Sequence, residues 1–331
     1  MPPVFTLADL SLLMIEPVSP DWDACLIVDL TGSETLPTDR AAAMGTWLAD
    51  QPTPVIGIGD EEGTRSDPLI AGVDLVAPAA EADRCREAVA RNPDAAAVLM
   101  EVLRITAGMP ARDALIVESL AYATLQGGPE HGRWLAAERQ VRPGRALPPK
   151  TDIVELDRQG EVLLVRLNSP ETRNSLSVPM RDALTDAFRL SALDDSIQRV
   201  VVSGNGPCFS AGGDLYEFGL AANPATAHRV RRRAMPAVYL IPQADRCEFH
   251  LHGACIGAGI EIPAFAGTVV ASPDAHFRLP EIGMGLIPGA GGCVSIPRRI
   301  GRHRAARMAL LGDRVSADQA LAWGLVDAIA S

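Results

Sequence analysis

The sequence predicts an α/β fold, because segments with strand character and segments with helical spacing alternate along the chain. Glu161–Leu167 is rich in β-branched residues and leucine, Val178–Leu193 carries apolar residues at helical spacing, and Arg199–Ser203 is a second short strand. A strand, a helix and a strand in succession form the basic unit of α/β proteins. At about 100–200 residues per domain, a chain of 331 residues suggests two domains.

The same alternation continues on both sides of this unit. Towards the C-terminus we expect strands at Phe249–Leu251 and Thr268–Ala271 and an amphipathic helix at Arg302–Leu311. The N-terminal part repeats the pattern on a smaller scale and ends in two helical patterns. Its expected elements are strands at Cys25–Leu30, Val55–Gly59 and Gly72–Val76, a helix at Ala41–Ala49, and helical patterns at Glu81–Ile105 and Ala111–Glu138.

The stretch between these two parts is typical of a linker. Val141–Asp152 combines three prolines and a glycine with charged residues and has no apolar period. We therefore expect an N-terminal domain over residues 1–140, a linker over 141–152 and a second domain over 153–331. The acids and arginines of the first domain are spaced as on solvated helix faces, and no catalytic constellation is visible there.

Composition excludes several classes of protein. The chain has 30 Lys and Arg against 41 Asp and Glu, a net charge of −11, which is the wrong sign for neutralising nucleic-acid phosphates. No apolar run approaches the length of a membrane span, and no basic stretch precedes the apolar N-terminal segment, so we expect a cytoplasmic chain. The six cysteines lie far apart without a C-x-x-C pair, which indicates reduced core thiols and predicts no metal site.

Three glycine-rich runs could carry chemistry. In Ser203–Asp214, paired glycines leave backbone N–H groups free to face a ligand, and Asp214 could cap a following helix. In His252–Ile262, a helix that begins near Gly257 would present free N–H groups of the kind an oxyanion site needs.

Two acids stand isolated in apolar surroundings in the second and third runs. Glu261 lies between two isoleucines, and Glu281 lies in the loop Phe277–Gly292 among prolines and glycines. A buried, unpaired carboxylate is costly, so such a group is exposed, paired or kept for chemistry. Two carboxylates with two sets of aimed N–H groups are what is needed to hold a water and stabilise an enolate.

Taken together, these runs resemble the crotonase (enoyl-CoA hydratase/isomerase) superfamily over roughly residues 152–329. Ser169–Leu176 is similar to the family's early CoA-binding turn, and Leu310–Ala317 and Ala322–Val326 resemble its later motifs. The resemblance implies a crotonase-like ββα spiral core for the second domain. It also implies a homotrimer or hexamer and an acyl-CoA thioester as substrate, with no metal or redox cofactor beyond the coenzyme A of the substrate.

The resemblance assigns roles to particular residues. The N–H groups of Gly213 and Ala258 would form the oxyanion hole for the thioester carbonyl, and Glu261 and Glu281 match the two catalytic glutamates of true hydratases. One glutamate would activate water for attack at the β-carbon, and the other would deliver a proton to the α-carbon. Further substrate or CoA contacts are implied at Arg173, Ala211, Gly212, Asp214 and Gly257, and the adenine and phosphate end of CoA would lie near Arg173 and residues 204–209.

The resemblance leaves other reactions open. Hydration of an enoyl-CoA, or dehydration of a 3-hydroxyacyl-CoA, is the favoured reading because both glutamates are present. The alternatives within the fold are an enoyl-CoA isomerase, a lyase, a thioester hydrolase and a cofactor-free dioxygenase. A non-catalytic acyl-CoA-binding subunit is an alternative of a different class.

Several features depart from the family pattern. Pro207 stands where a basic residue is frequent, and Glu248, His250 and His252 lie on one face of a strand that is usually aliphatic. They form either a core hydrogen-bond network or a modified active-site wall in which His250 is an added acid or base. We expect the arginines at 229 and 231–233 to lie on a helix, and one of them, with Arg232 as the candidate, could enter the acyl pocket.

The largest departure concerns the helices that follow the Gly-Leu-Val motif in the family and close the acyl pocket. The segment Gly72–Glu138 resembles that helical tail in pattern. We therefore expect the N-terminal domain to be a degenerate crotonase-like copy whose helices pack beside the Glu281 loop.

Overall fold

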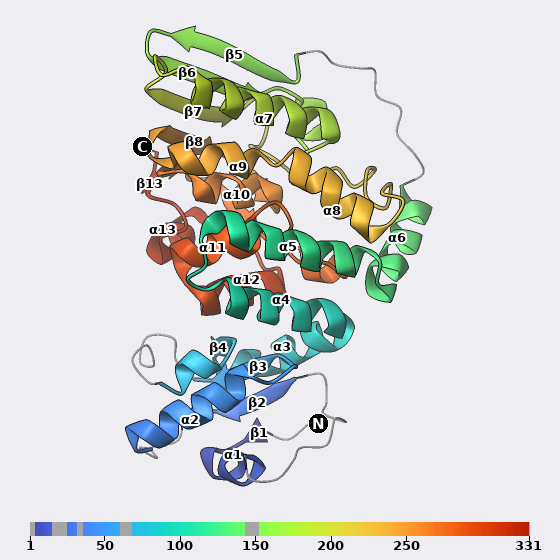
Figure 1. The fold of residues 1–331 in the computed structure, drawn as a ribbon, viewed down its shortest axis with the longest axis vertical. Helices are drawn as coiled ribbons and strands as arrows, with labels where there is room; N and C mark the ends of the chain where they lie inside the picture. Colours follow the sequence, from blue (N-terminus) through green and yellow to red (C-terminus); the bar gives the residue numbers. More distant parts are fainter. Residues whose placement is uncertain (1–3, 15–24, 32–35, 60–67, 143–151, 331) are drawn as a thin grey trace.

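A computed structural model describes residues 4–14, 25–31, 36–59, 68–142 and 152–330 (Figure 1). The predicted α/β fold is confirmed, with one sheet near the N-terminus and two in the C-terminal half. The expected linker at 141–152 lies almost entirely outside the described residues, so the division into domains stays a prediction. Within the described ranges, no helix has the length and apolar character needed to cross a membrane.

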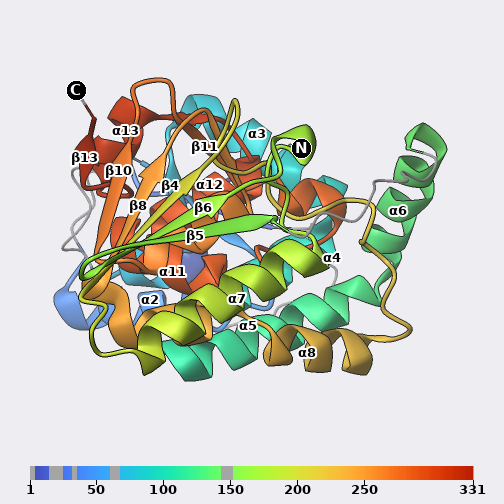
Figure 2. The same cartoon turned by 90° about the horizontal axis from the view of Figure 1, so that it is seen from above.

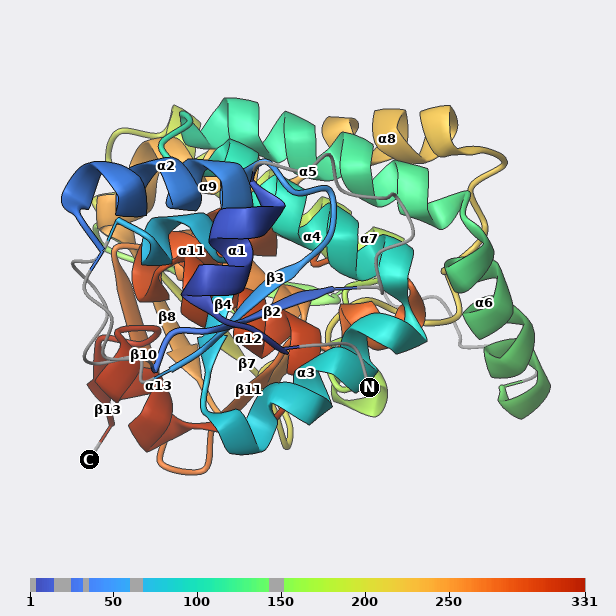
Figure 3. The same cartoon turned by 90° about the horizontal axis from the view of Figure 1, so that it is seen from below.

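The N-terminal sheet has four parallel strands in the order β1-β2-β3-β4. It lies with α1 and α2 at the lower end of Figure 1, and Figure 3 shows these two helices on its outer side. All four residues of β3 are buried, as expected for a parallel strand that is covered on both faces. The elements are β1 Val4–Phe5, α1 Leu7–Leu13, β2 Leu26–Asp29, α2 Thr38–Ala49, β3 Val55–Ile58 and β4 Leu75–Ala77.

The two helical patterns that follow the sheet form four helices rather than two. Pro93 begins the second helix and Pro129 the fourth, because proline has no N–H to continue the preceding helix but fits a first turn. The break before Pro129 is also favoured by Gly127 and Gly128, because glycine is a poor helix former. The helices are α3 Ala79–Arg91, α4 Pro93–Thr106, α5 Ala111–Gln126 and α6 Pro129–Val141.

The C-terminal half contains a six-stranded sheet in the order β13-β10-β8-β7-β6-β5, parallel except for the β5–β6 pair. A second sheet of this half has three strands in the order β12-β11-β9, and β9 belongs to the glycine-rich run His252–Ile262. The strands are β5 Val154–Gln159, β6 Val162–Leu167, β7 Arg199–Gly204, β8 Cys247–Leu251, β9 Ala254–Ile256, β10 Thr268–Ala271, β11 His276–Arg278, β12 Val315–Ser316 and β13 Ala328–Ile329.

The helices of this half include two with the residues that the sequence predicts, at 178–193 and 302–311. Figure 2 shows α7 and α8 on the same side of the six-stranded sheet as α5, so a helix of the N-terminal part lies among them. The helices are α7 Val178–Leu193, α8 Pro224–Arg233, α9 Pro236–Leu240, α10 Ala258–Glu261, α11 Gly292–Ile300, α12 Arg302–Leu311 and α13 Ala317–Trp323.

One hydrophobic core runs through both halves. It joins Ile56 and Leu99 of the N-terminal part to Leu163, Phe249 and Ile296 of the C-terminal part, all of them buried. The six cysteines are buried thiols, which confirms the expectation of core thiols. The N-terminal helices are therefore packed into the same body as the C-terminal sheet.

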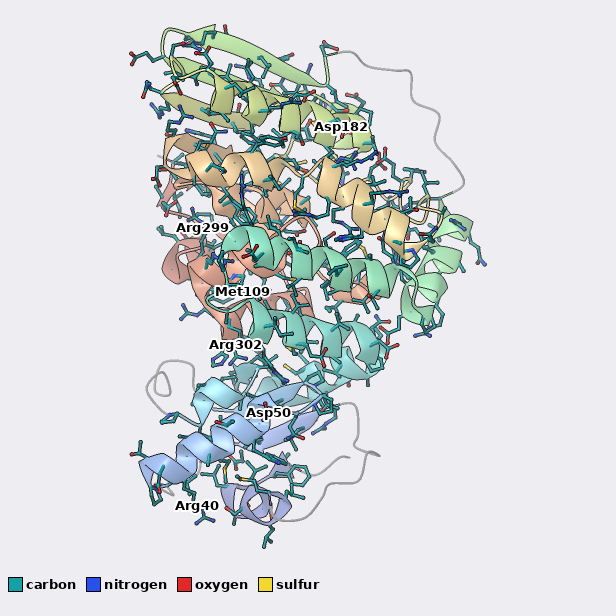
Figure 4. The ribbon with its side chains drawn as sticks, in the orientation of Figure 1. Arg40, Asp50, Met109, Asp182, Arg299 and Arg302 are labelled. Carbon is teal, nitrogen blue, oxygen red and sulfur yellow. The ribbon has the colours of Figure 1, made fainter. Side chains whose placement is uncertain are left out.

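A buried charge cluster also connects the halves. Asp74 is 1% exposed and accepts from Arg104 Nη2 at 2.5 Å, from Arg302 Nη1 at 3.5 Å and from the N–H of Val55 at 2.8 Å. Arg302 also donates to the carbonyls of Ala71 and Val73, and Figure 4 shows it at the edge of the N-terminal sheet.

The helices α3 and α6 lie beside the turn that carries Glu281. Asn92 Nδ2 donates to the Ile282 carbonyl at 2.8 Å, and His131 Nδ1 lies 3.0 Å from the Met284 carbonyl. Gly285 has a φ of +67°, and a Cβ there would meet the N–H nitrogen of His131 at 2.5 Å. The helices thus lie beside the Glu281 loop, while the idea of a degenerate crotonase-like copy stays a prediction.

We expect Asp74→Ala to lower the free energy of unfolding by about 3 kcal/mol, because it leaves two arginines without their buried carboxylate. Urea unfolding followed by circular dichroism measures the loss. Asp313→Ala is the matched control: Asp313 pairs with Arg84 at 2.8 Å, but both side chains are about half exposed, so the loss should stay below about 1 kcal/mol. Equal losses in the two variants would contradict the proposed importance of the Asp74 cluster.

Candidate active site

A cavity of about 560 Å³ opens between the N-terminal helix α5 and the C-terminal half. Its lining brings together four of the residues predicted to carry chemistry, namely Gly213, Ala258, Glu261 and Glu281. The remaining walls are mainly apolar and come from α7, α8 and the loop before α8, with two side chains from α5. The lining also includes Tyr122, Gln126, Leu176, Phe218, Arg231 and Met235.

Two backbone N–H groups face this cavity without a partner. Within the described part of the chain, neither the N–H of Gly213 nor that of Ala258 has a hydrogen-bond acceptor. Gly212 holds this arrangement with a φ of +88°, and a Cβ there would meet the Ile256 carbonyl oxygen at 2.7 Å. The close approach of the two glycine-rich runs therefore requires glycine at this position and leaves both N–H groups available to a carbonyl oxygen.

The two predicted carboxylates face one small space. A Cβ on Gly257 would lie 2.4 Å from Glu281 Oε1 and 3.6 Å from Glu261 Oε1. Glu261 is 2% exposed, and its Oε2 accepts from the N–H groups of Ala290 at 2.7 Å and Gly292 at 2.9 Å. Glu281 Oε2 is buried and has no hydrogen-bond partner among the described residues. One carboxylate is thus fixed by two donors, while the other has an oxygen free for a proton.

A third carboxylate, Glu118 of α5, adjoins this pair. It is fully buried and accepts from the N–H groups of Gly291 at 2.8 Å and Cys293 at 2.9 Å. Sequence reasoning missed it, because an acid at helical spacing is more often on a solvated face. The segment that showed no catalytic constellation therefore contributes a buried acid next to Glu261.

Burial raises the pKa of all three glutamates. It raises the pKa of Glu261 to about 7, although the N–H groups of Ala290 and Gly292 and the charge of Arg231 act in the opposite direction. The pKa of Glu281 is raised by burial and further by the charges of Glu261 and Glu118. The pKa of Glu118 is raised by burial and by Glu261. Such a group of interacting acids retains protons at neutral pH.

Of the five residues expected to contact the substrate or CoA, only Asp214 lines the cavity. Ala211 donates its N–H to the carbonyl of Arg173 at 2.9 Å, so these two residues join the early turn to the first glycine run. Arg173 is exposed and has a φ of +56°. Asp214 accepts from the N–H of Tyr216 in a turn and does not cap a helix, because the next helix begins only at Pro224.

The structure places His250 and Arg232 outside the cavity lining. The side chain of His250 is 47% exposed and its Nε2 lies 2.6 Å from Glu248 Oε1 on the outer face of β8, so it belongs neither to the core nor to an active-site wall. On α8 it is Arg231, not Arg232, that lines the cavity. Neighbouring residues of a helix point in directions about 100° apart, so spacing alone did not distinguish them.

Comparison with known proteins agrees with this site. Residues 157–331, slightly more than half the chain, match the family described as enoyl-CoA hydratase/isomerase. The chain therefore belongs to this family, also called the crotonase family, and the predicted crotonase-like fold of its C-terminal half is confirmed. Residues 1–156 are not matched by the family.

Relatives of known name include both hydratases and isomerases. The chain is 36% identical over 173 residues to the 2,3-dehydroadipyl-CoA hydratase of Escherichia coli, covering 52% of this chain and 66% of the relative. It is 33% identical over 171 residues to the 1,2-epoxyphenylacetyl-CoA isomerase of the same organism, covering 50% and 64%. The match thus spans less than two thirds of either relative.

Solved structures similar to this chain are also hydratases or isomerases and match about half of it. A putative enoyl-CoA hydratase/isomerase from Mycobacterium abscessus is 31% identical with a TM-score of 0.51, and the likeness covers 54% of this chain and 70% of that one. The enoyl-CoA hydratase of Mycobacterium smegmatis gives the same identity, TM-score and coverage.

We expect Glu118→Ala to lower the free energy of unfolding by about 2–4 kcal/mol, because two buried N–H groups lose their acceptor. Hydrogen exchange at the Gly291 and Cys293 amides should accelerate, and mass spectrometry of peptides from this loop measures it. Glu101→Ala, at an exposed position on α4, is the control and should change neither quantity. An unaltered exchange rate in Glu118→Ala would contradict the observed contacts.

The raised pKa of Glu261 predicts a pH-dependent stability. The pKa of this carboxyl group is 4.5 in the unfolded chain and about 7 in the folded protein. The folded state therefore disfavours the ionised form, and the group opposes folding most at a pH above 7, where it is ionised in both states. As the pH rises from 4.5 to above 7, the free energy of unfolding of the wild-type chain should therefore fall by up to about 3 kcal/mol relative to that of Glu261→Gln. Urea unfolding of both proteins from pH 5 to 8 measures this difference, and a difference independent of pH would contradict the assignment.

Proposed function

We propose that the chain hydrates an enoyl-CoA thioester, or dehydrates the corresponding 3-hydroxyacyl-CoA. The observation that supports this most is that Glu261 and Glu281 face one space beside the N–H groups of Gly213 and Ala258, which have no acceptor among the described residues. Family membership supports an acyl-CoA substrate.

The proposed oxyanion hole acts on the thioester carbonyl. The N–H groups of Gly213 and Ala258 donate to the carbonyl oxygen and stabilise the negative charge that develops there as the enolate forms. The donors are backbone groups on two glycine-rich runs held against each other, so they need little reorganisation during the reaction. The CoA end of the substrate would leave the cavity towards the exposed Arg173.

The surroundings of the two glutamates favour different roles. Two N–H donors stabilise the anionic form of Glu261, which therefore accepts a proton from the attacking water. Glu281 has an unpartnered oxygen and a raised pKa, so it is the protonated acid that delivers a proton to the α-carbon. The hydroxyl group goes to the β-carbon, and the water's proton ends on Glu261, so transfer between the two carboxyls restores the starting state.

Isomerisation of a double bond is the second candidate. It needs the same enolate and one acid–base group, and a relative at 33% identity is named as an isomerase. An isomerase would move a proton between carbons without adding water. We also keep a homotrimer or hexamer as a proposal, which light scattering after gel filtration tests.

We expect turnover of a panel of short, branched and aromatic enoyl-CoA thioesters with gain of one water, measured by mass spectrometry. Glu261→Gln and Glu281→Gln should each reduce the rate at least about 100-fold, because each removes a proton-transfer group. Glu101→Gln, at an exposed site on α4, should retain the wild-type rate.

Unchanged mass with deuterium uptake at the α-carbon would replace hydration by isomerisation. Binding of thioesters without turnover, unaffected by either glutamine variant, would instead indicate a binding subunit.

A further inference from the structure

The cavity carries two guanidinium groups with different surroundings. Arg181 is paired with Asp182 at 2.7 Å. Arg231 of α8 lies against α5 and contacts three neutral groups there. Its Nη1 donates to the Ser119 carbonyl at 3.3 Å, and its Nη2 donates to Gln126 Oε1 at 3.1 Å.

The third contact is an aromatic ring. The Cζ atom of Arg231 lies 4.0 Å from the centre of the Tyr122 ring, a cation–π contact that fixes the plane of the guanidinium. Among the described residues, no carboxylate lies within ion-pair distance of Arg231. Two of the five N–H donors of its guanidinium make these hydrogen bonds, so donors remain for a ligand.

Arg231 lies close to the reacting end of the cavity. The Tyr122 ring packs against Gly289, where a Cβ would meet the ring carbon Cδ2 at 2.2 Å. The next residue, Ala290, donates its N–H to Glu261. The Tyr122 ring therefore lies between Arg231 and the loop that holds Glu261.

A guanidinium in this setting favours an anionic ligand. Most of the cavity wall is apolar, and a cation there is poorly solvated unless an opposite charge joins it. A carboxylate fits best, because the planar fork of arginine can donate two parallel N–H bonds to its two oxygens. A neutral, purely aliphatic acyl chain would leave this charge unpaired.

We propose that the cavity binds CoA thioesters whose short acyl chain ends in a carboxylate, and that Arg231 binds this carboxylate. The inference rests on the proposed function and names its substrate class. Tyr122 and Gln126, which position Arg231, belong to α5, outside residues 157–331. The part of the chain that the family does not match would thus determine specificity.

The experiment compares glutaconyl-CoA, an enoyl-CoA with a terminal carboxylate, with its ω-methyl ester, which has the same chain without the charge. Wild type should show the higher kcat/KM for the acid. Arg231→Met should lower kcat/KM for the acid by roughly 10- to 100-fold and change that for the ester only a few-fold. Arg231→Lys, which keeps the charge and loses the fork, should lie between them. Arg233→Met, an exposed arginine of the same helix, should match wild type.

The alternative role of Arg231 is to offset the charge of the glutamate cluster. In that case Arg231→Met would lower kcat/KM equally for acid and ester, and the inference would be overturned. A wild-type preference for the ester would overturn it as well.

If neither thioester is turned over, binding decides the inference, and the panel of enoyl-CoA thioesters decides the proposed function separately. Titration calorimetry with the saturated glutaryl-CoA and its ω-methyl ester should show tighter binding of the acid, lost in Arg231→Met. Equal affinities would overturn the inference.

Discussion

The start of helix α11 is the constraint on which the site depends. Four successive N–H groups there serve two carboxylates in alternation: those of Ala290 and Gly292 bind Glu261, and those of Gly291 and Cys293 bind Glu118. The N-terminus of a helix stabilises negative charge through its free N–H groups and its dipole. Glycine is required at 292, where a Cβ would meet Glu261 Oε2 at 2.7 Å.

This arrangement makes the N-terminal part a component of the site. Helix α5 supplies Glu118 to the helix start, Tyr122 to the wall beside Gly289, and Gln126 to the guanidinium of Arg231. Helices α3 and α6 also lie beside the Glu281 turn. Because the core and the Asp74 cluster join the same two halves, loosening the N-terminal part would disturb both stability and the position of the carboxylates.

The electrostatics of the site follow from the crowding of Glu118, Glu261 and Glu281 beside a poorly solvated space that Arg231 also lines. The acids cannot all be ionised together, and the hydrogen-bond donors decide where the charge goes. Glu261 and Glu118 each have two donors, whereas Glu281 Oε2 has none among the described residues. In the proposed hydration, this difference would make Glu261 the proton acceptor and Glu281 the proton donor, although both are glutamates.

The sequence by itself determined the α/β class, the helices at 178–193 and 302–311, and the motif residues Gly213, Ala258, Glu261 and Glu281. The helices and the two isolated acids follow from local period and from short runs of glycine and proline, whereas the family resemblance singled out Gly213 and Ala258. It did not reveal Glu118 or select Arg231. Glu118 meets its donors 173 and 175 residues away, and Arg231 meets α5 more than 100 residues away. A helical acid or arginine has the same spacing on a solvated face and in a buried contact, so only tertiary packing decided which of them enter the site.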